Sequence, residues 1–341
     1  MSPSRSIVVA GAGAIGRTVA FMLARAGHAV TIVDPDLEGA NASRIAAGML
    51  GPAFEALFDG GRHELLREAL GLWLPLAREL GVPVAWDGAM AVGTRAEAQA
   101  WAAELTALGA EAELRHLGQD RWAAFCDEDR RIDPNWALQA LRQGAERHGA
   151  SFVTGRVTDF SDGLAQIEGR DAIAANGLVV ATGAGQGLVA VAPELARLIP
   201  VKGHILRAAN AYSRAPVVRR PDVYICRTTD GAFLGATMEE GRDDSDVDPT
   251  VVQELLASAG ALSDGLDRMV WSAAAGVRAA TPDGLPMVGQ GIASGVILAV
   301  GARRNGWLLA PMIAEVVLDV VEGRPKSPAA ELFDPSRFSR G

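Results

Sequence analysis

Residues 6–36 read SIVVAGAGAIGRTVAFMLARAGHAVTIVDPD, and this stretch carries the strongest indication of fold in the chain. A short apolar run opens it, and a second apolar run, HAVTIVD, ends at Asp34. Between the two runs, Gly11, Gly13 and Gly16 form the pattern G-x-G-x-x-G, and apolar residues then recur at near-helical spacing. The stretch therefore predicts a strand, a tight turn, a helix and a second strand of an α/β fold.

The three glycines and Asp34 together indicate dinucleotide binding. Gly11 permits the tight turn, Gly13 the close approach of a pyrophosphate, and Gly16 the contact between helix and strand. The first N–H groups of the helix bind the anion, and Asp34 is placed to accept a hydrogen bond from a ribose hydroxyl. An acid at this position disfavours NADP, whose ribose carries a phosphate, but it does not separate NAD from FAD. A glycine-rich turn in an unrelated α/β domain would explain the glycines but not Asp34.

The composition limits the class of protein. The chain has 341 residues, 49% of them hydrophobic, which is enough for two domains or one large one. Its net charge of −9 disfavours nucleic-acid binding, and no stretch approaches the ~20 unbroken apolar residues of a membrane span. Two cysteines and five scattered histidines indicate neither a disulfide framework nor a metal site. We expect a cytoplasmic protein without metal, nucleic-acid partner or membrane span; its oligomeric state is left open, a homo-oligomer included.

Several further segments carry helix signals. An apolar pattern predicts a helix over 63–80, which Pro75 is expected to kink or break. Asp133, directly before a proline, predicts the N-cap of another helix. Residues 249–260 predict a third helix.

Strands that end in small-residue turns occur near both ends of the chain, with short, closely spaced strands between them. The segment LVVATGAGQG, residues 178–187, predicts a buried strand and a turn that a phosphate can approach closely. This order predicts a discontinuous nucleotide-binding domain with a mostly β substrate domain inserted into it. We expect the nucleotide-binding domain to comprise residues 1–85, 140–200 and 272–330, and the substrate domain residues 86–139 and 201–271.

Arg303 and Arg304 directly precede an apolar helix that is predicted from Gly306 onward. A cation at a helix N-terminus is usually unfavourable, by about 0.3–1 kcal/mol. Either both side chains point into solvent, or an anion lies at this position.

Three segments in this order resemble the D-amino-acid-oxidase superfamily of flavoproteins: AAGML at 46–50, RAATPDGLPMVG at 278–289 and RNGWLLAP at 304–311. The resemblance covers nearly the whole chain and is closest to the glycine oxidases, the ThiO-type enzymes of thiamine synthesis. It implies a Rossmann-like FAD-binding domain of the glutathione-reductase type with an inserted, mostly antiparallel substrate domain. Relatives of sarcosine oxidase attach flavin through a cysteine in the stretch that matches 277–284. This chain has no cysteine there, so FAD is expected to bind noncovalently.

The resemblance also implies the residues of the site. Those expected to bind FAD are Gly11, Ala12, Gly13, Ile15, Gly16, Asp34, Ser43, Ala46, Ala47, Gly48, Met49, Val157, Ala181, Thr182, Gly183, Gly301, Arg304, Asn305, Gly306, Trp307 and Leu308. Arg278 and Tyr224 are expected to hold the substrate carboxylate, with Arg304 also at the active site. The alternatives are that Arg278 forms a structural ion pair and that Tyr224 belongs to the core of its strand.

The activity implied by the resemblance is oxidation of the C–N bond of a small amino acid: glycine, sarcosine or a D-amino acid. A hydride passes from the α-carbon to flavin N5, the imine is hydrolysed to an oxo acid, and O2 is reduced to hydrogen peroxide. The alternatives are a D-amino-acid dehydrogenase that uses another electron acceptor, a non-catalytic flavin-binding subunit of a complex, and an NAD-dependent dehydrogenase.

The chain departs from the family pattern beside the flavin. Family members often read GHFRNGIL where this chain reads GARRNGWL, residues 301–308. Ala302, Arg303 and Trp307 therefore alter the expected pocket. If Arg303 faces the pocket, it favours a substrate with a second acidic group; if it turns to solvent, it does not.

Overall fold

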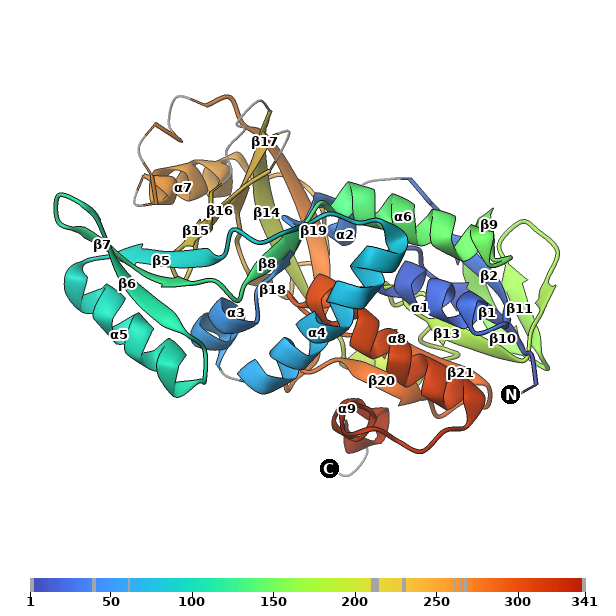
Figure 1. The fold of residues 1–341 in the computed structure, drawn as a ribbon. Helices are drawn as coiled ribbons and strands as arrows, with labels where there is room; N and C mark the ends of the chain where they lie inside the picture. Colours follow the sequence, from blue (N-terminus) through green and yellow to red (C-terminus); the bar gives the residue numbers. More distant parts are fainter. Residues whose placement is uncertain are drawn as a thin grey trace.

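The elements of the chain gather into two regions, each built on its own β-sheet (Figure 1). The computed structural model describes residues 3–38, 41–60, 62–209, 215–228, 231–260, 262–263, 265–266 and 269–338. Mixed sheets flanked by helices confirm the predicted α/β class.

The first region contains a six-stranded sheet in the order β20-β21-β13-β1-β2-β9. Its strands are β1 (Ser6–Ala10), β2 (Ala29–Asp34), β9 (Ser151–Thr154), β13 (Gly177–Val180), β20 (Met287–Gln290) and β21 (Val296–Val300). Five of them run parallel, and β20 pairs antiparallel with β21. The carboxyl ends of β1, β2, β13 and β21 therefore meet at one edge of the sheet, where ligands of open α/β sheets bind.

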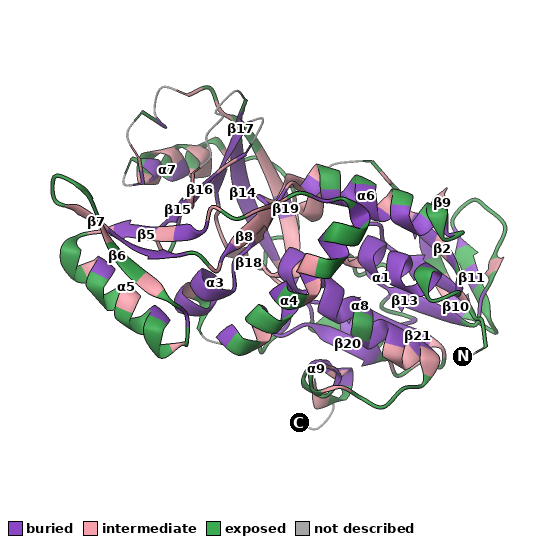
Figure 2. Ribbon diagram, in the orientation of Figure 1, coloured by how far each residue is buried: buried purple, intermediate pink, exposed green. Residues whose placement is uncertain are grey.

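Both faces of this sheet are covered, which explains why β1 is an unbroken apolar run. Ile7 and Val9 pack among helix residues on one face, while Val8 and Ala10 pack on the other face among residues of a small three-stranded sheet. The helices are α1 (Ala14–Arg25), α4 (His63–Leu80), α6 (Pro134–Arg147), α8 (Gly306–Glu322) and α9 (Pro328–Phe333). The small sheet consists of β10 (Val157–Ser161), β11 (Leu164–Ile167) and β12 (Ile173–Ala174). Figure 2 shows the strands between these layers as mainly buried.

The second region contains a nine-stranded sheet that is antiparallel except where β15 pairs with β5. Its path is β18-β14-β17-β16-β15-β5-β7-β6, and β19 pairs along β14. The strands are β5 (Ala89–Gly93), β6 (Ala112–Gly118), β7 (Arg121–Cys126), β14 (Ile199–Ala209), β15 (Val217–Arg219), β16 (Tyr224–Arg227), β17 (Gly231–Gly235), β18 (Glu239–Glu240) and β19 (Ser272–Ala280).

Helices cover this sheet as well. Residues of α3 (Pro52–Asp59) and α5 (Arg95–Ala107) share one core cluster with it, and residues of α7 (Pro249–Ala259) share another. The short helix α2 (Ala42–Ile45) lies against β19. A three-stranded sheet of β3 (Met49–Leu50), β8 (Arg130–Ile132) and β4 (Val84–Ala85) lies between the two regions. Two 3-10 helices, Pro193–Arg197 and Pro335–Phe338, complete the described elements.

The predicted helices are present, with one correction. α4 has the predicted bounds, but it continues through Pro75, so the expectation of a break there is wrong. Asp133 caps α6, because its carboxylate accepts a hydrogen bond from the N–H of Trp136 at 2.8 Å. Two elements cut across the expected domain limits: α6 spans residue 140 and packs on α1, and β19 belongs to the nine-stranded sheet although it begins at residue 272.

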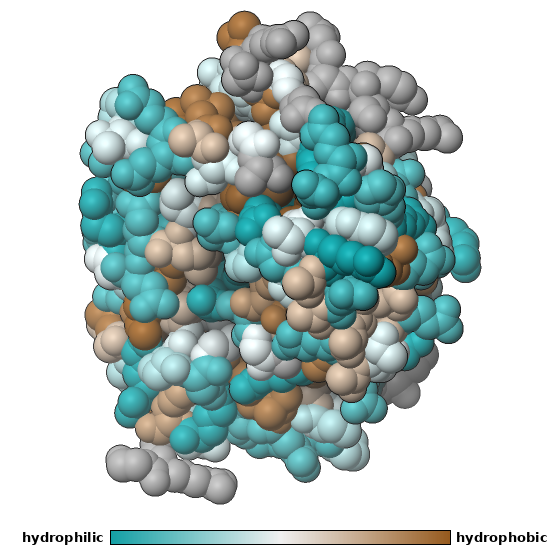
Figure 3. Space-filling model, turned by 90° about the vertical axis from the view of Figure 1, so that its left-hand side faces the viewer, coloured by the Kyte–Doolittle hydropathy of each residue, from teal (hydrophilic) through white to brown (hydrophobic). Residues whose placement is uncertain are grey.

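The surface on the side of α5, β6 and β7 carries both hydrophilic and apolar residues. Figure 3 shows hydrophilic side chains over most of this face, with apolar ones in separate small groups. None of the helices in the described ranges is both long and apolar enough to cross a membrane. No group of three or more His, Cys, Asp or Glu side chains in the same ranges is arranged to hold a metal ion.

The turn between β1 and α1 has no room for side chains at two of its glycines. Gly11 has a φ of +109°, and a Cβ there would lie 2.3 Å from the carbonyl oxygen of Ala181. A Cβ on Gly16 would lie 1.9 Å from the carbonyl oxygen of Gly11. The helix can therefore lie this close to β1 only because residue 16 is glycine.

We predict that Gly16→Ala destabilises the protein and weakens FAD retention, because the added methyl group forces α1 away from Gly11. Overpacking of this kind costs about 1–3 kcal/mol. Gly71→Ala is the matched control: this glycine is exposed on α4, with no atom within 4 Å of an added Cβ. Alanine there should stabilise the helix by up to ~1 kcal/mol. Chemical denaturation and bound-FAD content measure both effects; equal stability of the two variants would contradict the packing argument.

Candidate active site

A cavity of about 250 Å³ lies at the edge of the sheet where the parallel strands end. It takes residues from the β1–α1 turn, the end of β2, α2, the turn after β13, the end of β19 and the start of α8. Of the residues predicted to bind FAD, those that line it are Gly11, Gly13, Ile15, Asp34, Ser43, Ala46, Ala181, Thr182, Gly183, Gly301, Arg304, Gly306 and Trp307.

The backbone around this cavity fits a dinucleotide. Gly13, the N-cap residue of α1, has no side chain to cap the helix. The N–H of Ala12 donates to Asp34 Oδ2 at 2.7 Å, and that of Ala14 donates to Ser43 Oγ at 3.0 Å. A helix start of this kind attracts a phosphate. Asp34 also accepts the N–H of Asp36 at 2.8 Å, so two backbone groups fix the carboxylate that was predicted to bind ribose.

A second cavity, of about 350 Å³, adjoins the first on the side of the nine-stranded sheet. The two share the lining residues Ala42, Ala46, Arg278, Arg304 and Trp307. The remaining predicted residues on the second cavity are Ala47, Gly48, Met49, Asn305 and Tyr224. The structure therefore brings most of the predicted cofactor residues and both predicted carboxylate-binding residues to two adjoining cavities.

Four predicted FAD residues line neither cavity. Ala12 positions Asp34 through its N–H, and Gly16 packs against Gly11. Val157 is buried in β10, and Leu308 is buried in α8 among core residues.

Arg278 and Tyr224 lie along the floor of the second cavity because glycines of neighbouring strands leave space for them. A Cβ on Gly203 would lie 2.1 Å from Arg278 Nη1, and a Cβ on Gly235 would lie 2.6 Å from Tyr224 Oη. Arg278 Nη1 donates to the carbonyl of Thr237 at 3.2 Å. Burial lowers the pKa of Arg278, and it raises the pKa of Tyr224 to about 12 against the effect of the Arg278 charge. Tyr224 therefore keeps its proton at neutral pH and can donate it in a hydrogen bond.

Glu55 is a cavity residue that the sequence analysis did not select. It is 6% exposed, and two arginines hold it: Arg304 Nε lies 2.9 Å from Oε2, and Arg219 Nη2 donates to Oε1 at 3.0 Å. Burial opposes its ionisation, but Arg304 and then Arg219 bring the pKa of Glu55 below its usual range. A carboxyl group within the apolar run PAFEALF is the signal that could have identified it.

Asp129 lies behind this cluster, where it accepts the N–H of Ala53 at 2.9 Å. Burial raises the pKa of Asp129 to about 7, while the Arg219 charge and the hydrogen bond from Ala53 lower it. At neutral pH this carboxyl group therefore neutralises Arg219 only in part.

The two arginines before α8 have different positions. Arg304 lines both cavities and pairs with Glu55. Arg303 has a φ of +48°, and its side chain forms an ion pair with Asp59. Arg303 lies at the cofactor cavity but is not among the residues that line the second cavity. This argues against the alternative in which Arg303 faces the substrate.

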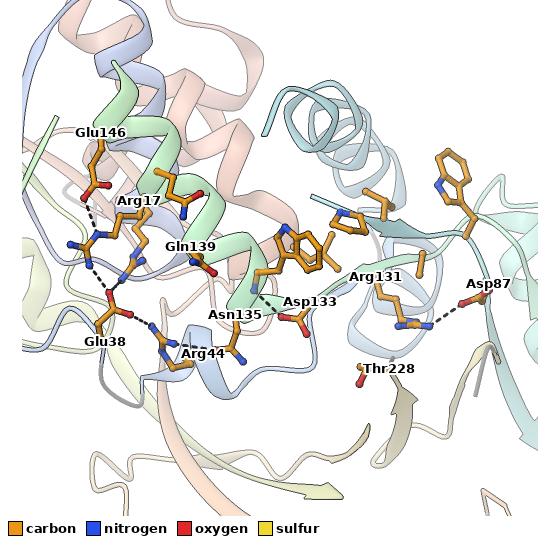
Figure 4. A pocket seen from close by; sticks show the side chains of 18 residues that line it. Arg17, Glu38, Arg44, Asp87, Arg131, Asp133, Asn135, Gln139, Glu146 and Thr228 are labelled. Carbon is orange, nitrogen blue, oxygen red and sulfur yellow. Dashed lines mark hydrogen bonds and ion pairs between the residues drawn. The ribbon is translucent and has the colours of Figure 1, made fainter. Parts of the chain in front are cut away.

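A wider cavity of about 1250 Å³ opens beside α6 (Figure 4). It shares no lining residue with the other two. Its arginines are paired: Arg44 lies 3.0 Å and Arg142 2.5 Å from Glu38, and Arg131 lies 2.9 Å from an Asp87 oxygen. We assign it no part in the site described above.

A dinucleotide cradle that opens into an arginine-lined cavity is the arrangement expected of a flavin-dependent oxidoreductase, and comparison with known families gives the same class. Residues 6–320 match the family model described as "FAD dependent oxidoreductase", DAO. The chain belongs to this family; it is an FAD-dependent oxidoreductase, and its cofactor is FAD.

Individual relatives have low sequence identity to this chain. The chain is 28% identical over 369 residues to the "Bifunctional protein ThiO/ThiG" of Synechocystis sp., covering 99% of this chain and 55% of that protein. It is 28% identical over 358 residues to the "Glycine oxidase" of Bacillus licheniformis, covering 97% and 96%. The crystal structure of glycine oxidase from Geobacillus kaustophilus superposes with a TM-score of 0.86 at 25% identity, covering 98% and 99%. The chain thus spans about half the length of the bifunctional relative.

We predict that Asp34→Ala raises the Kd for FAD, because the cofactor loses a charged hydrogen-bond acceptor. Bonds of this type contribute about 1.5–3 kcal/mol, which corresponds to roughly 10- to 150-fold in Kd. Titration of the apoprotein with FAD measures the change, and circular dichroism in excess FAD checks the fold. Asp36→Ala is the control, since it keeps the N–H that bonds to Asp34. If Asp34→Ala and Asp36→Ala bind FAD equally, Asp34 does not hold the cofactor.

Proposed function

We propose that this chain oxidises the C–N bond of a small amino acid and thereby reduces its bound FAD. One observation carries the proposal: the half-buried Arg278 and the buried Tyr224 line one cavity, which adjoins the cofactor cavity and shares lining residues with it. A planar guanidinium binds a carboxylate with two parallel hydrogen bonds. The protonated Tyr224 hydroxyl supplies a further donor for the same group.

The residues of the chain bind and orient the substrate. Arg278 and Tyr224 fix its carboxylate on the face of the nine-stranded sheet, so the α-carbon points toward the shared wall of the two cavities. FAD, when bound, supplies the acceptor for the hydride that leaves the α-carbon. Arg304 places a positive charge, raised in pKa by Glu55, where the two cavities meet. Positioning and fixed charge therefore form the chain's contribution to catalysis.

The finer features of the reaction follow the same proposal. The imine product hydrolyses to an oxo acid, and O2 accepts the electrons to give hydrogen peroxide. FAD is held noncovalently, because Cys126 and Cys226 are both buried outside the stretch that would carry the link. Glycine, sarcosine and D-amino acids are the candidate substrates, as the names of the glycine oxidase relatives support. We place the enzyme in the cytoplasm.

The proposal also divides the chain into domains. The six-stranded sheet with its helices would form an FAD-binding domain of the glutathione-reductase type, and the nine-stranded sheet would form the substrate domain. The elements favour limits that leave α6 whole in the first domain and β19 in the second. Residues 272–280 then count with the substrate domain, and the site lies where the two meet.

Anaerobic reduction of the bound flavin tests the function. Glycine, sarcosine and D-amino acids are added to the purified holoprotein, and absorbance near 450 nm is followed; loss of the flavin band is the expected result. Under air, peroxide should form with each turnover. Bleaching without peroxide would indicate a dehydrogenase with another acceptor. No bleaching by any amino acid would contradict the proposal and favour a non-catalytic flavin subunit.

We predict that Arg278→Ala lowers kcat/KM by roughly 30- to 1000-fold, because about 2–4 kcal/mol of charged hydrogen bonding to the carboxylate is lost. The flavin spectrum should stay unchanged. Arg278→Lys keeps the positive charge but loses the two parallel donors of the guanidinium, so its kcat/KM should lie between those of the wild type and Arg278→Ala. Steady-state kinetics on the substrate found by the bleaching screen measure the effect; unchanged kinetics in both variants would show that the carboxylate binds elsewhere.

A further inference from the structure

We propose that Arg219 determines substrate specificity by binding a second acidic group, so that the preferred substrates are amino acids with two acid groups. This inference rests on the proposed function, because it names the substrate class of the same cavity. Nothing in the sequence analysis pointed to Arg219.

Arg219 lies on the same face of the nine-stranded sheet as the proposed carboxylate clamp. Arg219 is directly opposite Tyr224 in the neighbouring strand β16. Tyr224 is opposite Gly235 of β17, and Gly235 is opposite Ile205 of β14. Residues directly opposite each other in a sheet share a face. The partner of Ile205 in β19 comes four residues before Arg278, so Arg278 shares that face as well. Arg278 lies on β19 and Arg219 on β15, and the strands β14, β17 and β16 lie between them in the sheet.

The guanidinium of Arg219 is buried and has an unused donor. Its side chain is 2% exposed and lines the cavity. Nη2 donates to Glu55, but Nε has no hydrogen-bond partner in the described ranges. The rings of Phe54 and Phe58 lie 5.8 and 5.3 Å from the guanidinium carbon and fix its position. A buried donor without a partner is costly. Because Arg219 lines the cavity and shares its counter-ion with Arg304, an acidic group of the substrate would stabilise its guanidinium.

The positive charges around the cavity also exceed the negative charges. Arg219 and Arg304 share the carboxylate of Glu55, the nearby Asp129 neutralises Arg219 only in part, and Arg278 forms no ion pair with any described residue. With one substrate carboxylate at Arg278, the positive charges of Arg219 and Arg304 still exceed the negative charge of Glu55 and Asp129. A second acidic group at Arg219 brings the buried cluster close to neutrality, which the low-dielectric surroundings favour.

Other acids near the cavity do not fill this role. Asp222 and Glu254 line its outer part, but both are exposed to solvent. Arg303, the other candidate for a second anion site, already pairs with Asp59. Arg219 is buried, has a donor without a partner, and shares its counter-ion with Arg304. These properties favour it as the site of a second acidic group.

Binding of non-oxidisable acids tests the inference without catalysis. FAD-loaded protein is titrated with malonate, succinate, glutarate and acetate, and changes in the visible flavin spectrum give Kd values. The best dicarboxylate should bind at least 10-fold more tightly than acetate, since a charge-assisted bond is worth about 1.5–3 kcal/mol. Arg219→Met should remove that difference. Arg227→Met, which deletes an arginine from the opposite face of β16, should preserve it.

Substrate preference gives the second readout. Acidic D-amino acids and iminodicarboxylates should exceed glycine and sarcosine in kcat/KM by at least 10-fold. Arg219→Met should lower kcat/KM for the diacids about 10- to 100-fold more than it lowers kcat/KM for neutral substrates. Flavin content and thermal unfolding confirm that each variant is folded. If Arg219→Met does not hold FAD, Arg219→Gln, which keeps a polar group beside Glu55, replaces it in both experiments.

The outcomes separate this inference from the proposed function. Dicarboxylate binding that depends on Arg219, with no flavin reduction by any amino acid, would support the anion site and contradict the proposed function. Flavin reduction by neutral amino acids, with acetate binding as tightly as dicarboxylates, would overturn the inference and leave the function standing. An equal loss for diacids and neutral substrates in the variant would also overturn it, because Arg219 would then have only a structural role.

Discussion

The close packing of three backbone segments, the β1–α1 turn, the start of α1 and the turn after β13, determines the rest of this structure. Gly11 lies against both Gly16 and Ala181, and no side chain fits between them. This contact places the first turn of α1 at the edge of the parallel sheet, where its N–H groups face the cofactor cavity. A β-bridge between Ala280 and Ala302 then ties the end of β19 to the loop before α8 at the same edge. The cofactor cavity and the floor of the substrate cavity are therefore held in a fixed relation by backbone contacts.

The charged side chains around Glu55 are buried at an energetic cost. Glu55 is ionised in a position where burial alone would favour its neutral form, and Arg304 and Arg219 compensate for that burial. Removing one member of such a cluster leaves an uncompensated buried charge, at a cost of about 3–5 kcal/mol. In the proposed function, the negative groups of the substrate bind the arginines of the same cavity. Stability and ligand binding thus depend on the same few side chains.

The parts of the structure that the sequence predicted well depend on neighbours in the chain. The glycine pattern, Asp34 and the helix over 63–80 are local signals, and the structure shows each of them in place. The resemblance to known flavoproteins identified Arg278 and Tyr224, which the structure brings into one cavity. The role of Arg219 could not be predicted, because it depends on which strands β15 pairs with.

The ion pair of Arg303 with Asp59 was equally out of reach, since 244 residues separate the partners. The same limit applies to the domain division. The pattern of β19 is that of a strand, but only its pairing with β14 shows which sheet it joins.

Two tryptophans also link elements far apart in sequence: Trp73 Nε1 donates to the carbonyl of Trp307 at 2.6 Å, and Trp307 Nε1 donates to the carbonyl of Ser43 at 3.0 Å. Both indoles are buried, whereas Trp86 and Trp136 are 61% and 55% exposed. Because Trp307 lines both cavities, a flavin bound there should quench the emission of the buried pair more strongly than that of the exposed tryptophans, so the protein fluorescence should report cofactor occupancy.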